Sequence, residues 1–179
     1  MPLRKAQRRD LPRIASTYAA AFWDEEVMGK LMHPYRQEHP QDFLRYWKHE
    51  VAEWYWSYSH QIMVSYETKP TRDGDEEQVL TGVADWIRHG EGWERLWGIW
   101  AWWDPRSVVH GLTSHFWSGP RSSGWYLNFL AVHPDFQKRG YGSRLAEWGV
   151  ERARKENVTA SVISGVGRDP FYRRCGFDD

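Results

Sequence analysis

A short glycine-containing loop, QKRGYG at residues 137–142, has the residue types of an anion-binding site. It follows an apolar segment at 125–132 and leads directly into a helical pattern. Glycines allow backbone N–H groups to approach an oxyanion closely, and the first turn of a helix presents further N–H groups at the positive end of its dipole. Lys138, Arg139 and Arg144 add positive charge at the same place. The loop therefore predicts a site for a phosphate or a diphosphate.

This loop matches neither of the common glycine fingerprints for nucleotides. No Gly-Lys-Ser/Thr sequence follows it, so it is not a Walker loop. Leu145 stands where the three-glycine dinucleotide fingerprint has its last glycine. An ordinary tight turn that leads into a helix is the alternative interpretation.

The elements that must position the loop follow from the spacing of apolar residues. We expect a strand at 3–7, and then a helix that Asp10 caps and that has Pro12 in its first turn. A longer helix is expected from Pro40 to about Tyr58, because apolar residues recur there on one face. The remaining expected elements are a short helix at 25–32, antiparallel strands at 61–66 and 79–87 around a polar loop at 69–78, a buried strand at 125–132, a helix at 140–157, a strand at 158–163 and a short helix from Asp169 to Gly176.

The order of these elements predicts the fold class. Strand, loop, helix and strand over residues 125–163 form a βαβ unit, whose two strands must be parallel. The hairpin that precedes it adds antiparallel strands. We therefore expect an α/β (α+β) fold with a mixed, mostly antiparallel central sheet, and the length of 179 residues predicts one domain over 1–179.

A tryptophan-rich stretch at residues 90–124 interrupts this order. It contains six of the 13 tryptophans of the chain, and Asp104-Pro105 divides it. We interpret it as a helical insertion that forms a lid between two strands. Its tryptophans form either a small satellite core or the aromatic wall of a pocket for an amine.

Composition excludes several classes of function. The formal net charge is zero, with 24 basic and 24 acidic residues, so we expect neither nucleic acid nor an anionic membrane as a partner. No apolar run is long enough to span a membrane, and no apolar stretch of a secretory signal follows the basic residues 1–9, so we expect a cytoplasmic protein. The single cysteine, Cys175, is expected to be a small buried hydrophobe. The spacing of His110 and His115 does not place both on one helical face, so we expect no metal.

Two segments together resemble the GCN5-related N-acetyltransferase (GNAT) superfamily: FLAVHPDFQKRGYGSRL at 129–145 and FYRRCGF at 171–177. The opening of the chain over residues 3–22 is also similar to that family. The resemblance implies transfer of an acetyl group from acetyl-CoA to an amine, and we expect the amine of a small molecule. It also implies that the loop after the fourth strand binds the pyrophosphate of the coenzyme and that the fourth strand pairs with its pantetheine arm beside a bulge. The implied coenzyme-binding residues are Gln137, Lys138, Arg139, Gly140, Tyr141, Gly142 and Ser143 in the loop and Leu130, Ala131 and Val132 in the strand.

The same resemblance suggests roles in catalysis. The amine attacks the thioester directly, a strand N–H near Val132 stabilises the oxyanion, and Tyr172 occupies the position of the tyrosine that protonates the leaving thiolate. Histone-type members have a glutamate general base in the fourth strand, where this chain has Tyr126. The candidates for the base are therefore Asp85, His133 and His33. Asp85 is preferred because burial of a carboxylate among apolar strand residues is costly, so a functional role would explain its presence there.

Two further expectations depend on the resemblance. A coenzyme-binding or protein-interaction module without catalysis is the alternative function, because Tyr126 is not a carboxylate. Members of the family usually continue with two more strands after the position of Gly176-Phe177, where this sequence stops. We therefore expect the sheet to end near its fifth strand, with an open edge that favours a homodimer.

Overall fold

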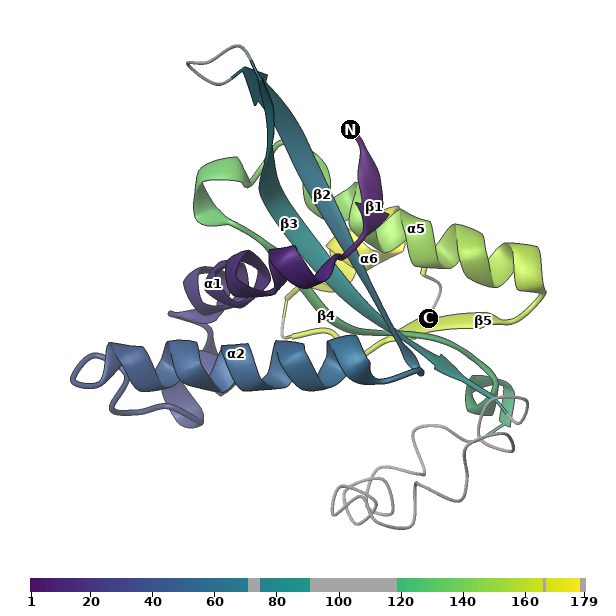
Figure 1. Cartoon of the computed structure of the whole chain (residues 1–179). Coiled ribbons are helices and arrows are strands. Elements are labelled where there is room, and N and C mark those ends of the chain that lie inside the picture. Colours follow the sequence, from purple (N-terminus) through teal and green to yellow (C-terminus); the bar gives the residue numbers. More distant parts are fainter. Residues whose placement is uncertain (71–74, 91–118, 166, 178–179) are drawn as a thin grey trace.

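A five-stranded sheet organises the computed structural model, which describes residues 1–70, 75–90, 119–165 and 167–177 (Figure 1). The strand order follows the chain, and the first four strands are antiparallel to their neighbours while the fourth and fifth are parallel. This arrangement confirms the expected fold class, and within the described residues the sheet ends at the fifth strand. The strands are β1 (Leu3–Lys5), β2 (His60–Pro70), β3 (Glu76–His89), β4 (Gly124–Val132) and β5 (Thr159–Val162).

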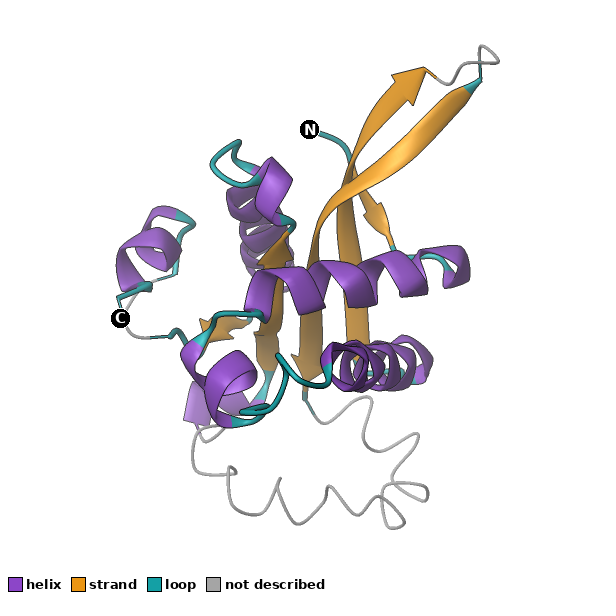
Figure 2. Ribbon diagram, turned by 90° about the vertical axis from the view of Figure 1, so that its left-hand side faces the viewer, coloured by secondary structure: helices purple, strands orange, loops and turns teal. Residues whose placement is uncertain are grey.

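Helices cover both faces of this sheet. Helices α1 (Leu11–Phe22) and α2 (Pro40–Trp56) lie on one face, and Figure 2 shows them in front of the strands. Helix α5 (Tyr141–Glu156) lies on the other face, and the short α6 (Asp169–Arg174) follows β5. None of the helices that the structure describes is long and apolar enough to cross a membrane.

Strand alternation divides the core into two clusters, one on each face of the sheet. On the α1 and α2 face, the apolar face expected for the longer helix is confirmed, and Trp47 and Val51 are fully buried there. Tyr58 is the exception, because α2 ends at Trp56 and leaves Tyr58 exposed. On the α5 face, the indole of Trp86 is fully buried and donates from Nε1 to the carbonyl of Leu145 over 3.3 Å.

Two local expectations were wrong, and a third was right in position but not in the type of helix. Asp10 precedes α1, but its side chain does not cap the helix: it accepts from the backbone N–H of Gln7 over 2.7 Å and pairs with Arg4 over 2.6 Å. The expected loop at 69–78 is much shorter, because β2 extends to Pro70 and β3 begins at Glu76, which places Lys69 opposite Glu77. The expected short helix at 25–32 is a single π-helical turn, η2 (Glu26–Leu31).

The expected tryptophan-rich lid at 90–124 lies almost entirely outside the described residues. Gly90 and the last part of the stretch are described, and there η4 (Gly119–Ser122) forms a 3₁₀ turn before β4.

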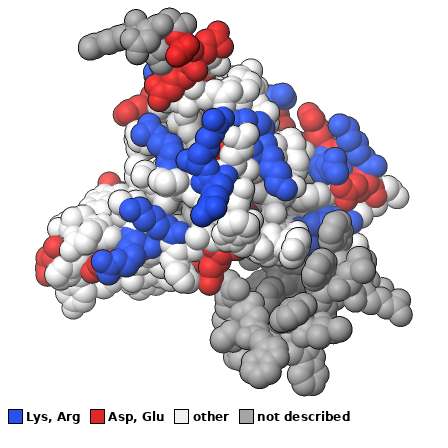
Figure 3. Space-filling view, viewed as in Figure 1, with Lys and Arg blue, Asp and Glu red and all other residues white. Residues whose placement is uncertain are grey.

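Positive charge gathers on the face that Figure 1 presents, although the whole chain is neutral. Figure 3 shows Lys and Arg side chains across the middle of this face, around β1 and the start of α1. The sequence supplies Arg4, Lys5, Arg8 and Arg9 to this region, and only Arg4 of these forms an ion pair within the described residues.

Candidate active site

Strand β4 separates from β5 halfway along its length. The two strands pair from Gly124 to Leu127, opposite Thr159–Val162, and beyond that point β4 pairs only with β3 among the described strands. The separation begins at a bulge: Phe129 lies opposite Asp85 and Leu127 opposite Trp86, so that Asn128 has no partner in the register. The fold therefore leaves residues 130–132 without a strand partner on the β5 side among the described residues, as the family resemblance implied, and we call this unpaired edge the opening beside β4.

The glycine-containing loop closes the end of this opening. After the 3₁₀ turn η5 (Pro134–Phe136), Lys138 has a φ of 61° and Gly140 a φ of 83°, which is the left-handed region that favours glycine. A non-glycine residue there costs roughly 1 kcal/mol, so Lys138 is held in a strained conformation of a kind that clusters at functional sites. Helix α5 begins immediately afterwards, and no side chain caps it. Its first N–H groups therefore remain available to an anion.

The side chains of the loop are arranged by their neighbours. Gln137 donates from Nε2 to the carbonyl of Val132 over 3.2 Å, which fixes the loop to the end of β4. Arg139 lies 3.7 Å from Glu67, and the hydroxyl of Tyr141 also donates to Glu67. The charge of Arg139 is thus partly balanced.

Lys138 is different from Arg139. Its side chain is exposed, and it forms no ion pair within the described part of the chain. The ammonium of Lys138 is therefore the cation of the loop that is free to meet an incoming anion.

Tyr172 approaches the same opening from α6. Its ring packs against Phe171 and Phe177, with centroid distances of 5.0 and 5.7 Å. A methyl group placed on Gly142 would lie 3.5 Å from both Phe171 and Val132, so the start of α5, the end of β4 and α6 meet here. Burial raises the pKa of Tyr172, and its hydroxyl therefore stays protonated at neutral pH and can donate a proton.

Cys175 lies close to Tyr172 but has the surroundings of a packing residue. It is buried, and burial raises the pKa of its thiol above the ordinary value although Ser143 donates toward it. A thiol in such a place is a poor nucleophile, as the sequence analysis expected.

Asp85 is fully buried and joins three strands on the α1 and α2 face. Its Oδ2 accepts from Nδ1 of His60 on β2 and from Nδ2 of Asn128 at the bulge of β4, each over 2.8 Å. Its Oδ1 has no hydrogen-bond partner within the described residues. Sequence reasoning singled out Asp85 but missed His60 and Asn128, since the pairing register that brings them together is not visible in the chain.

The two other candidates for the base are engaged elsewhere. Nδ1 of His33 lies 2.7 Å from the carbonyl of Met28, and its ring packs against Phe43. His133 is a turn residue whose Nδ1 accepts from the backbone N–H of Asp135 over 3.4 Å. The structure therefore brings neither histidine to Asp85.

Tyr126 lies on the same face as Asp85, because it is opposite Ile87, two residues along β3. Burial raises the pKa of Tyr126 to about 12, and the neighbouring Tyr172 and Asp85 add to the effect. Tyr126 therefore links the surroundings of Tyr172 with those of Asp85, but it remains a neutral phenol at physiological pH.

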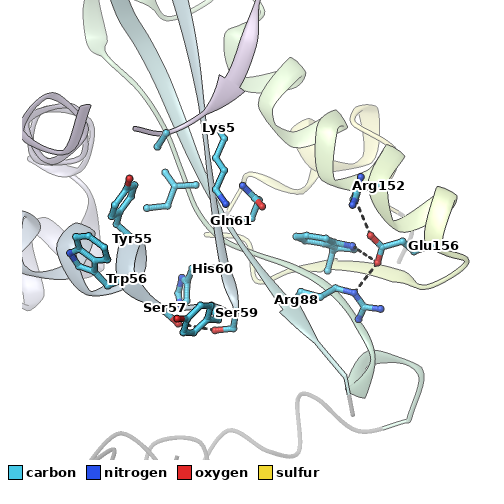
Figure 4. Close-up of a pocket in the computed structure, with 14 residues that line it drawn as sticks. Lys5, Tyr55, Trp56, Ser57, Ser59, His60, Gln61, Arg88, Arg152 and Glu156 are labelled. Atoms are coloured by element: carbon cyan, nitrogen blue, oxygen red, sulfur yellow. Dashed lines mark hydrogen bonds and ion pairs between the residues drawn. The ribbon is translucent and has the colours of Figure 1, made fainter. Parts of the chain in front are cut away.

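A pocket of about 530 Å³ lies beside the start of β2, between the C-terminal ends of α2 and α5 (Figure 4). The side chain of His60 lines this pocket. On the other side Glu156 accepts hydrogen bonds from Arg88, Trp125 and Arg152, which fixes the end of α5 to β3 and β4.

An opening between two splayed strands, next to a helix start without a side-chain cap and to a tyrosine, is the arrangement that the resemblance to acetyltransferases implied. The model of the acetyltransferase (GNAT) family matches residues 32–177. The match covers most of the chain, and this protein belongs to that family.

Solved structures with low sequence identity share the fold. A protein of Corynebacterium glutamicum described as histone acetyltransferase HPA2 and related acetyltransferase is 20% identical, with a TM-score of 0.58 over 97% of this chain and 82% of that one. The aminoglycoside antibiotic 6'-N-acetyltransferase AAC(6')-IG of Acinetobacter haemolyticus is 12% identical, with a TM-score of 0.55 over 100% and 92%. AAC(6')-Iy, solved with the bisubstrate analogue CoA-S-monomethyl-acetylneamine, is 13% identical, with a TM-score of 0.56 over 99% and 90%.

Proposed function

We propose that this protein transfers the acetyl group of acetyl-CoA to the amine of a small molecule. The observation that carries this proposal is the separation of β4 from β5 directly beside the uncapped start of α5. An unpaired strand and a set of free N–H groups in line with it fit the two polar parts of coenzyme A, its amide-containing pantetheine arm and its pyrophosphate.

The coenzyme then lies along the end of β4 and the glycine-containing loop. Its pantetheine amides pair with Leu130, Ala131 and Val132, and its pyrophosphate meets the N–H groups of the loop. The loop residues with this role are Gln137, Lys138, Arg139, Gly140, Tyr141, Gly142 and Ser143. No metal takes part in this scheme, because backbone N–H groups and Lys138 supply the positive charge.

The chemistry is a direct displacement. The amine nitrogen forms a bond to the thioester carbon, the carbon–sulfur bond breaks, and a β4 N–H near Val132 stabilises the oxyanion between these events. Tyr172, which burial keeps protonated at neutral pH, gives its proton to the leaving thiolate. The attacking nitrogen loses a proton as the amide forms, and this proton restores Tyr172. Asp85, the candidate base from the sequence, is fully buried and hydrogen-bonded to His60, so it acts on the acceptor ammonium only through a neighbouring group.

Two structural neighbours favour a small-molecule acceptor, because one is described as an aminoglycoside antibiotic 6'-N-acetyltransferase and the other was solved with the bisubstrate analogue CoA-S-monomethyl-acetylneamine. A Clostridium acetobutylicum neighbour described as a predicted acetyltransferase was solved with acetyl-CoA, which favours that donor. We further propose that the protein acts in the cytoplasm, without nucleic acid or membrane partners, and that the open edge of β5 pairs two copies into a homodimer.

A second candidate is a coenzyme-binding or protein-interaction module that has lost catalysis. The observation that favours it is Tyr126, which stands where the resemblance places the glutamate of histone-type members. With its pKa raised to about 12, Tyr126 stays protonated at neutral pH and cannot accept a proton.

A thiol-release assay separates the two functions. The purified protein is mixed with acetyl-CoA and a panel of amines, namely benzylamine, tyramine, spermidine, kanamycin and aniline, and the acetylated product is identified by mass spectrometry. An acetyltransferase releases one thiol for each amide formed. Tight binding of coenzyme A without release of thiol for any amine would instead favour the second candidate.

A further inference from the structure

The buried carboxylate of Asp85 holds one histidine in a defined orientation. Asp85 is an acceptor when ionised, so Nδ1 of His60 must donate the hydrogen bond that joins them over 2.8 Å. The other ring nitrogen, Nε2, is then an unprotonated acceptor. This is the arrangement by which a carboxylate fixes the tautomer of a histidine that acts as a general base.

The position of His60 leaves Nε2 accessible. The side chain is 13% exposed, and its ring stacks on Trp54 with an interplanar angle of 4°, so that its edge is free on the side away from Asp85. Nε2 has no hydrogen-bond partner among the described residues. It is not one of the buried polar atoms, so it is exposed to solvent. His60 also lines the pocket beside β2 (Figure 4). Nε2 can therefore exchange a proton with water there.

The other titratable groups of this face do not provide a base. Asp85 is fully buried and cannot meet the acceptor itself. Tyr126 is a neutral phenol with a pKa of about 12, and the hydroxyl of Tyr18 on α1 is buried with its pKa raised by burial. The carboxylate that shares the pocket with His60 is Glu156, and it already accepts hydrogen bonds from Arg88, Trp125 and Arg152. The other ionisable groups that line the pocket are the phenols Tyr55 and Tyr58 and the cations Lys5, Arg88 and Arg152.

The lateral position of His60 sets its distance from the reaction. His60 and Tyr126 both lie opposite Ile87, so two strand spacings, roughly 10 Å, separate their backbones. Both side chains point to the face that α1 and α2 cover, so a proton that passes between these positions needs a chain of waters along this face.

We propose that His60 is the general base of acetyl transfer and that Asp85 is its positioning residue. This inference rests on the proposed function. The acceptor ammonium loses one proton, which passes through water to Nε2 of His60. The imidazole becomes an imidazolium beside the carboxylate of Asp85, the neutral amine attacks the thioester, and the imidazolium later returns its proton to water.

Two variants and one pair of substrates test this inference. With the best alkylamine of the panel, His60→Ala is expected to lower kcat about 10²-fold at pH 7, as loss of a general base does, with KM for acetyl-CoA unchanged. Asp85→Asn is expected to lower kcat as well, since an amide does not fix the tautomer. With aniline, which is already a neutral amine at pH 7, both variants are expected to retain the wild-type rate.

Chemical rescue adds a measurement that a merely structural role would not move. The pocket has room for a small molecule, so free imidazole is expected to restore turnover of His60→Ala in proportion to its unprotonated fraction. His49→Gln, an exposed histidine of α2, is the matched control and should behave as wild type. Melting temperature and affinity for coenzyme A, measured for every variant, establish that each one is folded.

The outcomes are distinguishable. A wild-type protein that acetylates no amine would contradict the proposed function and the role of His60 with it. An active wild type together with folded variants that show full turnover of the alkylamine would overturn the role of His60 alone. Equal losses of kcat with the alkylamine and with aniline, without rescue by imidazole, would also overturn the role of His60, because they would show that His60 serves only in packing.

Discussion

Gly142 offers a test in which stability and coenzyme binding are expected to change in opposite directions. It is the second residue of α5, and its φ lies outside the left-handed region. In Gly142→Ala the new methyl would lie 3.5 Å from Val132 Cγ2 and 3.5 Å from Phe171 Cζ. These are ordinary van der Waals contacts, so the free protein accepts the methyl without rearrangement.

The magnitudes follow from this geometry. Glycine in a helix is about 0.5–1 kcal/mol less favourable than alanine, so the free energy of unfolding should stay the same or rise slightly. The methyl, however, occupies the space between the end of β4 and α6, where we place the coenzyme. Affinity for coenzyme A should fall at least tenfold, which is about 1.4 kcal/mol.

Urea denaturation and calorimetric titration with coenzyme A measure the two quantities. Gly140→Ala is the contrasting variant, because its φ of 83° and a contact of 3.0 Å with Met1 Cε should cost about 1 kcal/mol of stability. Full coenzyme affinity in a stable Gly142→Ala protein would refute the placement of the coenzyme beside this residue.

Three further predictions concern the acid, the core and the effect of pH. Tyr172→Phe should lower kcat about 10²-fold in the thiol-release assay with unchanged affinity for coenzyme A. An unchanged kcat would show that Tyr172 serves only in packing. Gly149→Ala should cost about 3 kcal/mol in urea denaturation, because its Cβ would lie 2.3 Å from the buried Trp86 ring, and a smaller loss would mean that the ring can move. Burial opposes the ionised form of Asp10, but hydrogen bonds from Arg4 and a backbone N–H leave its pKa below the ordinary value. Stability from this carboxylate is therefore present above about pH 4 and lost below it, so the melting temperature of Asp10→Asn should fall less on acidification than that of wild type.

The sequence predicted those parts of the fold that depend on local pattern. The spacing of Phe43, Trp47, Val51 and Trp54 predicted the buried face of α2, and the uncharged run at 125–132 predicted a buried strand. Both patterns arise because burial on one or both faces of an element selects apolar residues at the spacing of that element, and this spacing is visible in the sequence.

The parts that were missed depend on pairing between distant residues. Asp10 was expected to cap a helix, but its carboxylate binds the guanidinium of Arg4 instead. Which of the two partners Asp10 binds depends on the geometry of the turn between β1 and α1. His60 and Asp85 are 25 residues apart, and only the register between β2 and β3 brings them together. The family resemblance implied a bulge in the fourth strand, but its position at Asn128 is set by the register, and no residue type marks it.

The central claim is that the opening beside β4 binds the coenzyme, and amide hydrogen exchange with and without acetyl-CoA tests it most directly. Protection is expected in two segments, residues 130–132 of β4 and residues 138–143 of the loop and the start of α5, with little change at the pocket beside β2. Protection confined to that pocket, or no protection in either segment at a saturating concentration of acetyl-CoA, would contradict the claim.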